Sequence, residues 1–320
     1  MKNSMKNLKN AINKTASALA TALVVSAALA LPVMSSATAN ATPNTKTLTP
    51  LWSLNNFDQP ESVISDASGQ HLYVSNINGQ PTQLNGKGYI SKLSINGKVL
   101  NQHWLKGMDA PKGMAIKGDT LYVADMQQVH VVSISQRRIM NSLVAPKAKM
   151  LNDITIGDDG SVYISDLLGG GIYRIKSRIK SRIKHHTLAI WFNPTQLPHP
   201  NGLLWHNGSL LVASWGRGLK DDFTTQTPGS IYKINMGTSV NKPSLVPLAA
   251  AKQMGNLDGL TQNNGNLYVS DWINGDLFKV TAKRKEKLLT LKPGLADISS
   301  RNGVLFAPLM MDGVVRAWKI

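Results

Sequence analysis

Short apolar segments separated by Gly-rich or polar turns dominate the chain after residue 50, and helical periodicity is nearly absent there. One pattern, of the form Leu-Tyr-Val-Ser-Asp, recurs along this part of the chain. It occupies Leu72–Asn76, Leu121–Asp125, Val162–Asp166, Leu210–Ser214, Leu267–Asp271 and, in degenerate form, Leu305–Leu309. Successive copies begin 49, 41, 48, 57 and 38 residues apart. Repeats of this length indicate one supersecondary unit that is used several times.

Each copy is followed by further strand patterns. Third strands are expected at Gly88–Leu93, Met126–Ile134, Gly171–Ile175, Gly229–Ile234, Gly275–Val280 and Gly313–Trp318. Fourth strands are expected at Lys98–Leu105, Arg138–Val144, Thr187–Phe192, Ser244–Ala250 and Lys287–Leu291. With an innermost strand before each copy, four antiparallel strands per repeat predict an all-β fold, a six-bladed β-propeller. The sixth repeat has no fourth strand before Ile320, so we expect Thr47–Leu54 to complete that blade and remove its exposed edge.

Residues 1–41 have the features of an export signal. A positively charged segment, an apolar segment at Ala16–Met34 and small residues at 37–41 follow one another. We therefore predict a signal peptide at 1–41 and a single propeller domain at 42–320, in a periplasmic or secreted protein. The alternative is an uncleaved membrane anchor, because Ala16–Met34 is nearly long enough to span a bilayer. Pro32 and the small residues favour cleavage, which leaves no transmembrane span in the mature form.

The composition limits the chemistry and suggests partners. The chain has no cysteine, which excludes disulfides, thiolate ligands and cysteine nucleophiles. Its formal charge is +17, of which residues 1–41 contribute only four lysines. For an exported protein this charge favours an anionic envelope surface or polymer, or an acidic small molecule, over nucleic acid. Solubility alone is the other explanation of the charge.

A tandem duplication of Arg-Ile-Lys-Ser interrupts the repeat spacing at residues 174–186. If this segment forms strands, all its Arg and Lys side chains lie on one face. A hairpin insertion could then present six positive charges to an anionic partner. The alternative is a sequence expansion tolerated on a solvated blade edge.

The innermost strand of each blade is expected to begin beside the central channel. These starts read Glu61-Ser62-Val63, Lys112-Gly113-Met114, Asn152-Asp153-Ile154, Asn201-Gly202-Leu203, Asp258-Gly259-Leu260 and Ala296-Asp297-Ile298. Four of the six leading residues carry side-chain oxygens, which with no imidazole or thiolate favour a hard divalent cation, Ca²⁺ ahead of Mg²⁺. Gly202 and Gly259 are expected to let the backbone approach the ion or its ligand. The alternative is that Asn and Asp only cap turns between blades.

These motifs resemble the regucalcin/gluconolactonase family (senescence marker protein-like) of six-bladed propellers, and more distantly the paraoxonases. The resemblance spans roughly residues 50–320. It implies that Glu61, Asn201 and Asp258 bind one divalent cation, and that Asn152 lies beside the metal and a small-molecule substrate. The implied activity is metal-assisted hydrolysis of a lactone or another ester.

The resemblance also implies roles for individual side chains. Asp258 is the best candidate to accept a proton, with Asp153 and Asp297 as nearby alternatives, while Asn152 orients the substrate. Lys112 either holds an anionic group of the substrate or balances the charge of the channel. No Gly-x-Ser-x-Gly elbow supports a serine nucleophile, and His199 is expected in a loop at the channel mouth rather than in catalysis.

Two departures from the family pattern bear on the substrate. The family's Glu-Gly-Pro is Glu61-Ser62-Val63 here, and the arginine just upstream of Asn-Asp in sugar-lactone members is replaced by Met150. Both count against a sugar lactone. They also keep open a second class of function, a non-catalytic propeller that binds a ligand or partner over a structural divalent cation.

Overall fold

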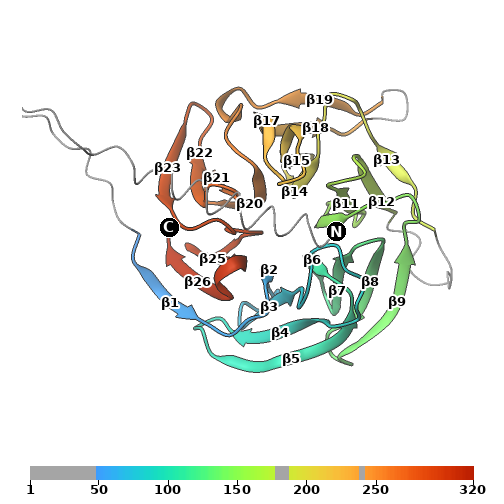
Figure 1. The fold of residues 1–320 in the computed structure, drawn as a ribbon, viewed down its shortest axis with the longest axis vertical. Helices are drawn as coiled ribbons and strands as arrows, with labels where there is room; N and C mark the ends of the chain where they lie inside the picture. The colour runs from blue at the N-terminus through green and yellow to red at the C-terminus, as the bar shows by residue number, and fades with distance from the viewer. Residues whose placement is uncertain (1–47, 177–186, 238–241) are drawn as a thin grey trace, which may run out of the picture.

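The computed structural model describes residues 48–176, 187–237 and 242–320. Six four-stranded antiparallel sheets surround a central axis (Figure 1). The first three are β2 (Pro60–Ser65), β3 (His71–Asn76), β4 (Gly88–Ser94), β5 (Val99–Met108); β6 (Pro111–Lys117), β7 (Thr120–Asp125), β8 (Gln128–Ser133), β9 (Arg138–Val144); and β10 (Leu151–Ile156), β11 (Val162–Asp166), β12 (Ile172–Ile175), β13 (Ile190–Phe192). The last three are β14 (Pro200–His206), β15 (Ser209–Ser214), β18 (Ile231–Asn235), β19 (Ser244–Pro247); β20 (Leu257–Asn263), β21 (Asn266–Asp271), β22 (Asp276–Val280), β23 (Lys285–Thr290); and β24 (Ser299–Arg301), β25 (Val304–Leu309), β26 (Val314–Lys319), β1 (Pro50–Leu54). The prediction of a six-bladed β-propeller is confirmed.

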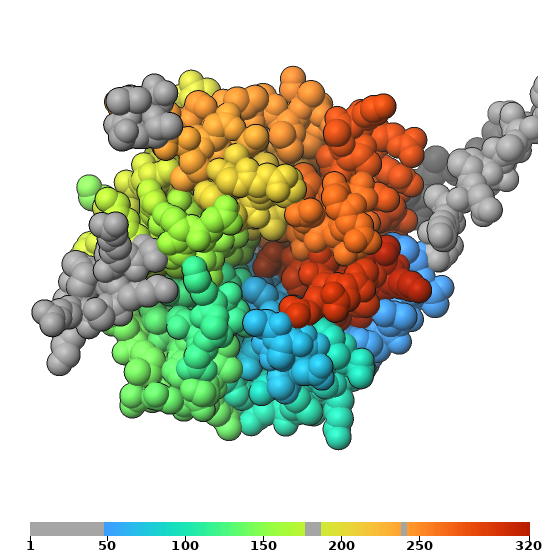
Figure 2. All heavy atoms as spheres, turned by 180° about the vertical axis from the view of Figure 1, so that it is seen from behind, coloured from blue at the N-terminus to red at the C-terminus, as the bar shows by residue number. Residues whose placement is uncertain are grey.

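The N-terminal strand closes the ring, as predicted. β1 pairs antiparallel with β26, with Ser53 opposite Arg316 and Leu54 opposite Val315. The blue β1 lies along the red C-terminal strands in Figure 1 and again, from behind, in Figure 2. Pairing the two ends of the chain in one sheet leaves no blade short of a strand.

The repeated Leu-Tyr-Val-Ser-Asp pattern is explained by packing between blades. Tyr73, Tyr163 and Tyr268 hold the same position in three blades and are all buried. Each packs in a cluster with residues of the following blade, for example Tyr73 with Met114 and Leu121. Because both faces of each second strand are covered, tyrosine and serine alternate there with leucine and valine, all of them buried.

Several strand bounds differ from those expected. β13 begins at Ile190 rather than Thr187, because Leu188 donates its backbone N–H to the carbonyl of Val144 in the preceding blade. β19 ends at Pro247, and the 3₁₀ helix η2 (Ala249–Ala251) follows it. A further hairpin, β16 (Gly216–Leu219) with β17 (Thr225–Pro228), was not predicted; it is inserted between β15 and β18 of the fourth blade.

The sixth blade begins later than the sequence suggested. β24 starts at Ser299, whereas residues 296–298 belong to the junction with the first blade. There Asp297 donates its backbone N–H to the carbonyl of Glu61 and forms a parallel bridge with Ser62. The junction of the last and first blades therefore directly adjoins the start of β2.

The predicted basic hairpin is only partly within the described residues. Arg174 lies in β12, donates a hydrogen bond to Asp159 at 3.0 Å and packs over the rings of Tyr163 and Trp191. Arg174 is thus held by contacts within its own blade. Residues 177–186, and the predicted signal at 1–41, lie outside the described part of the chain. Within the described part, no helix has the length and apolar character to cross a membrane.

Candidate functional site

A β-bulge recurs where the first five innermost strands begin. The register between first and second strands shifts between Pro60 and Val63, and at the equivalent positions of the next four blades. Two residues, such as Glu61 and Ser62, thus lie opposite a single residue of the second strand, Ser75. Bulges release residues from the ladder and re-aim their side chains. The six leading residues aligned in the sequence, which we call the channel residues, include the first bulge residue of each of these five blades.

Serines of the second strands stabilise three of these bulges. Ser75 accepts the backbone N–H of Ser62, Ser165 that of Asp153 and Ser270 that of Gly259, at 2.9, 2.9 and 2.8 Å. The bulge takes these N–H groups out of the ladder, and the hydroxyls satisfy them. The serine of the repeat is therefore structural, and Ser270 also donates to the carbonyl of Ala296.

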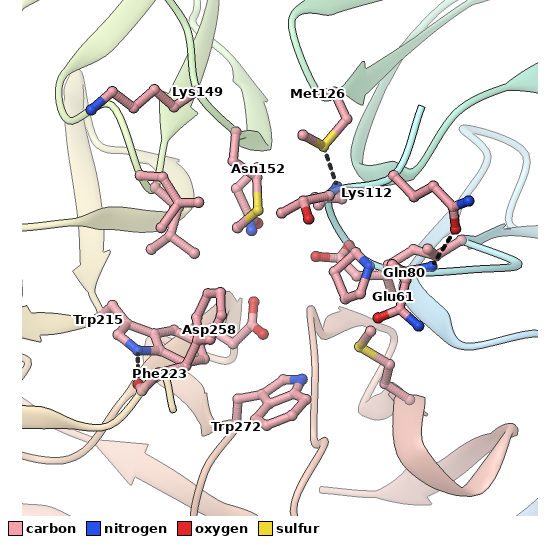
Figure 3. Close-up of a pocket in the computed structure, with 18 of the residues that line it drawn as sticks. Glu61, Gln80, Lys112, Met126, Lys149, Asn152, Trp215, Phe223, Asp258 and Trp272 are labelled. Atoms are coloured by element: carbon pink, nitrogen blue, oxygen red, sulfur yellow. Dashed lines mark hydrogen bonds between the residues drawn. The ribbon is translucent and has the colours of Figure 1, made fainter. Parts of the chain in front are cut away.

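Four channel residues line a cavity of about 830 Å³ on the propeller axis. They are Glu61, Lys112, Asn152 and Asp258, each from a different blade (Figure 3). All four are at least 96% buried, so they form the floor of the cavity. Asn201 lies just behind them, fully buried, and donates its side-chain N–H to the carbonyl of Leu257.

Four oxygens at this floor are buried without a hydrogen-bond partner. They are Glu61 Oε2, Asn152 Oδ1, Asn201 Oδ1 and Asp258 Oδ1. A buried polar atom without a partner costs about 1–3 kcal/mol, more for a charged group. Four such atoms from four different blades fit a ligand that supplies positive charge. Carboxylate and amide oxygens are the donors that Ca²⁺ prefers.

Repulsion among the channel carboxyl groups also favours a positively charged ligand at the floor. Burial, and then the charges of Asp258 and Asp297, raise the pKa of Glu61 well above its usual range, although Lys112 acts against this. Burial and the charge of Asp297 likewise raise the pKa of Asp258, against a hydrogen bond from Asn201. Several buried carboxyl groups thus lie near one ammonium group, an arrangement that a divalent cation would stabilise.

Lys112 is the basic member of the floor. Its Nζ donates to the carbonyl of Ala110 at 2.8 Å and lies 3.5 Å from Sδ of Met126. Burial lowers the pKa of Lys112, while the charges of Glu61 and Asp125 act in the opposite direction. Two of its contacts are thus internal, and the group remains on the cavity surface.

The two alternative acids lie behind the cavity floor. Asp153 accepts the backbone N–H groups of Ile154 and Leu203, both at 2.6 Å, and so joins the third blade to the fourth. Asp297 accepts the hydroxyl of Ser62 at 2.5 Å, and burial raises the pKa of Asp297 to about 7. Neither residue lines the cavity. Asp258 is therefore the better placed proton acceptor.

The glycines after the channel residues have a different role from the one expected. A Cβ on Gly202 would lie 2.0 Å from the carbonyl oxygen of Asp258, and one on Gly259 would lie 2.2 Å from the backbone nitrogen of Ile298. These glycines face the backbone of the next blade rather than an ion. They allow neighbouring blades to approach closely around the channel, and the expectation is corrected accordingly.

Sequence reasoning missed the walls of the cavity. The residue immediately after each second strand is apolar, buried and part of the cavity lining. These six residues, which we call the apolar collar, are Ile77, Met126, Leu167, Trp215, Trp272 and Met310. The signal was present in the sequence as one apolar residue directly after every copy of the repeat.

Other candidates are placed outside the cavity lining. His199 bonds the carbonyl of Leu167 through Nδ1 at 2.9 Å, as a loop residue would. The hydroxyl of Ser214 donates to the carbonyl of Pro198. Within residues 48–176, 187–237 and 242–320, no three His, Cys, Asp or Glu side chains gather as a metal site. The predicted ligand set has only two carboxylates, Glu61 and Asp258, and takes its third oxygen from an amide.

Comparisons with known proteins identify the fold. No protein-family model matches the chain, and no curated protein matches its sequence. A gluconolactonase from Xanthomonas campestris is similar in structure, with a TM-score of 0.60 and 15% identity over 83% of this chain and 88% of its own. Virginiamycin B lyase from Staphylococcus aureus is similar as well, with a TM-score of 0.52 and 14% identity over 84% of this chain and 99% of its own.

Hydrazine synthase from Kuenenia stuttgartiensis is also similar, with a TM-score of 0.56 and 12% identity over 87% of this chain and 99% of that one. The activities in these names differ from one another. At such identities the likeness concerns the fold alone, a propeller on which unrelated functions are found. The chain is thus a six-bladed β-propeller whose structural relatives include a gluconolactonase and a lyase.

Proposed function

We propose that this protein is an exported hydrolase of lactones or related esters that uses one divalent cation, Ca²⁺ before others, in the central channel. The observation that carries the proposal is the set of four unpartnered oxygens beneath a large cavity. Glu61, Asn201 and Asp258 would hold the cation. Structural likeness to a gluconolactonase supports the same class of reaction.

Each residue of the floor would have a different role in hydrolysis. A bound cation would supply a Lewis acid for the carbonyl oxygen and acidify water. Asp258 takes the proton of the attacking water, whose oxygen bonds to the carbonyl carbon. The C–O bond to the leaving oxygen then breaks, and that oxygen receives a proton. Asn152 points into the cavity (Figure 3) and orients the substrate, while Lys112 offsets negative charge.

A panel of lactones and aryl esters, assayed with Ca²⁺ and with EDTA, tests this proposal. Cleavage that requires the cation and disappears in Asp258→Ala would support it. If no compound is cleaved with any divalent cation while Ca²⁺ still raises the melting temperature, the hydrolase assignment is wrong. That result would favour the second candidate, a non-catalytic propeller that binds a ligand over a structural cation, for which Met150 in place of an arginine is the supporting observation.

Export and the anionic partner belong to the same proposal. Export is inferred from residues 1–41, and the anionic partner from the formal charge of +17. The N-terminal sequence of protein recovered from the cell envelope and from the medium tests the cleavage. A mature N-terminus near residue 42 is expected, and recovery of the uncleaved chain in the membrane fraction would favour the anchor.

A further inference from the structure

The cavity has two chemically distinct levels. The floor presents Glu61, Lys112, Asn152 and Asp258, and the apolar collar surrounds the cavity with one residue from each blade. Polar side chains, among them Gln80, Gln83, Gln127 and Lys149, line another part of the wall. A ligand whose carbonyl reaches the floor can therefore place an apolar part against the collar. Such apolar walls around a few polar groups are typical of sites that bind apolar ligands with one polar function.

Aromatic side chains form one side of this wall. Trp215 and Trp272 belong to adjacent blades, with ring centroids 6.2 Å apart and ring planes inclined by 46°. Phe223, carried by the β16–β17 hairpin, lines the cavity beside them (Figure 3). The indole Nε1 of Trp215 donates to the backbone carbonyl of Phe223 at 2.8 Å. Because its one polar atom is engaged there, Trp215 offers only apolar ring surface to a ligand.

Methionines complete the wall on other sides. Met126, Met150 and Met310 line the same cavity, and thioether side chains adapt to aromatic rings and make favourable contacts with them. Met150 is also the position where the sequence departs from sugar-lactone proteins. Hydroxyl groups of a substrate that lie against these methionines or the aromatic rings find no partner there, and each such hydroxyl lowers affinity about tenfold.

We propose that the ligand of this cavity is an aromatic lactone or ester, with an aryl group held between Trp215, Trp272 and Phe223 and its carbonyl at the floor. The inference rests on the proposed function for the position of the carbonyl. It goes further in naming the substrate class. The cavity, at about 830 Å³, is large enough for a compound of two or three rings.

Binding of non-hydrolysable lactams tests the inference separately from catalysis. We would compare an aryl lactam, an alkyl lactam of equal carbon number and a polyhydroxylated lactam by calorimetry on the Ca²⁺-loaded protein. The aryl lactam is expected to bind at least tenfold more tightly than the polyhydroxylated one. Equal or tighter binding of the polyhydroxylated lactam overturns the proposal, and equal binding of the alkyl lactam overturns its aromatic part.

Variants locate the aryl group. Phe223→Ala should lower the affinity for the aryl lactam about three- to tenfold and leave the affinity for the polyhydroxylated lactam unchanged. Phe223→Leu should have an intermediate affinity for the aryl lactam. Val246→Ala, an exposed apolar residue on β19 of the same blade, is the matched control and should change neither. An unchanged aryl affinity in Phe223→Ala, at unchanged melting temperature, overturns the placement. Aryl lactam binding without cleavage of any lactone would refute the hydrolase and leave the ligand class standing.

Discussion

Acidic residues lie at two neighbouring places in the blades, and their surroundings differ. At the end of the second strand, Asp166 accepts three backbone N–H groups of adjacent loops. At the start of the first strand, Glu61 and Asp258 each keep an oxygen without a partner. Both kinds are buried. Burial therefore does not mark a site, whereas a buried acid whose hydrogen-bonding capacity is unfilled does.

The two sets also differ in how much the residue type changes from one blade to the next. The residues at the ends of the second strands, which we call the strand-end residues, are Asn76, Asp125, Asp166, Ser214, Asp271 and Leu309. Aspartate occurs three times among them, and each time it accepts backbone N–H groups of the loop that enters its own blade from the preceding blade. The channel residues are nearly all different from one another. A repeated residue serves the repeated fold, whereas unlike residues at one repeated position are what the proposed single ligand on the axis would require.

The largest expected effect separates Asp258 from Asp166. Asp258→Asn should lower kcat/KM about 10²- to 10⁴-fold, as loss of a general base does. It should not lower the melting temperature of the cation-free protein, because burial and the charge of Asp297 already disfavour the charged form of Asp258. Initial rates and melting curves on the purified variant measure both quantities.

Asp166→Asn is the matched control at a strand-end position. It should lose about 1–3 kcal/mol of stability, because one of the two acceptor oxygens is replaced by a donor. Its kcat/KM per folded molecule should stay within about twofold of the parent, since Asp166 does not line the cavity. Equal loss of activity in both variants, below their melting temperatures, would remove the distinction between the two sets.

The repeat made the fold and the floor predictable from the sequence. Tyr73, Tyr163 and Tyr268 recur because each blade must cover the next, so the pattern encodes blade packing directly. Once the blades were aligned, Glu61 and Asp258 fell at equivalent positions beside the axis, where both are found. Ring closure followed from the missing strand of the sixth repeat.

Features that depend on contacts between blades were not predictable in the same way. Gly202 and Gly259 were assigned to an ion because the sequence does not reveal that the next backbone lies against them. Asp153 looked like a channel acid, yet its oxygens accept N–H groups of its own strand and of the fourth blade. The collar recurs in the sequence, but a single apolar residue such as Trp272 after a strand does not reveal whether it faces the channel or the space between two blades.

A pH titration compares two strand-end residues. Burial raises the pKa of Asp271 from 3.8 to about 6, despite hydrogen bonds from Asn274. The folded-state pKa lies above that of the unfolded chain, so ionisation costs the parent about 3 kcal/mol at neutral pH, recovered as the pH falls from 6 to 4. Asp271→Asn should lack this recovery in urea unfolding at pH 4, 5, 6 and 7.

The pKa of Asp125 is shifted in the opposite direction, so this residue serves as the control. Burial alone would raise its pKa, but hydrogen bonds from His130 and two backbone N–H groups outweigh that effect and lower it. Its contribution is therefore present above about pH 4 and is lost at more acid pH. Asp125→Asn should be less stable than the parent by a constant amount above that value, and the difference should shrink below it. Parallel profiles for the parent and Asp271→Asn between pH 4 and 6 would contradict the assignment.

Cation binding should depend on the channel residues and not on the strand-end residues. At a Ca²⁺ concentration one hundred times its dissociation constant, the folded state gains about 2.7 kcal/mol, seen as a higher melting temperature in calorimetry. Glu61→Gln should abolish most of this gain. Asp125→Asn should begin from a lower melting temperature and keep the full shift. A full shift in Glu61→Gln would place the cation elsewhere.

The smallest expected effect concerns the serine that stabilises the bulge at Asp258. Ser270→Ala leaves the N–H of Gly259 and the carbonyl of Ala296 without their partner, so we expect a loss of about 1–3 kcal/mol in urea unfolding. Activity should fall less than fivefold, because Ala124 and Ala213 occupy the same position in blades that form the bulge without a hydroxyl. Ser68→Ala is the control: its exposed hydroxyl bonds only Asp66 and Gln70 in a surface turn, so the variant should lose less than about 1 kcal/mol and keep full activity. A loss of activity comparable to that of Asp258→Asn would mean that the hydroxyl itself takes part in the site. Ser270 would then have a role in the reaction rather than only in the fold.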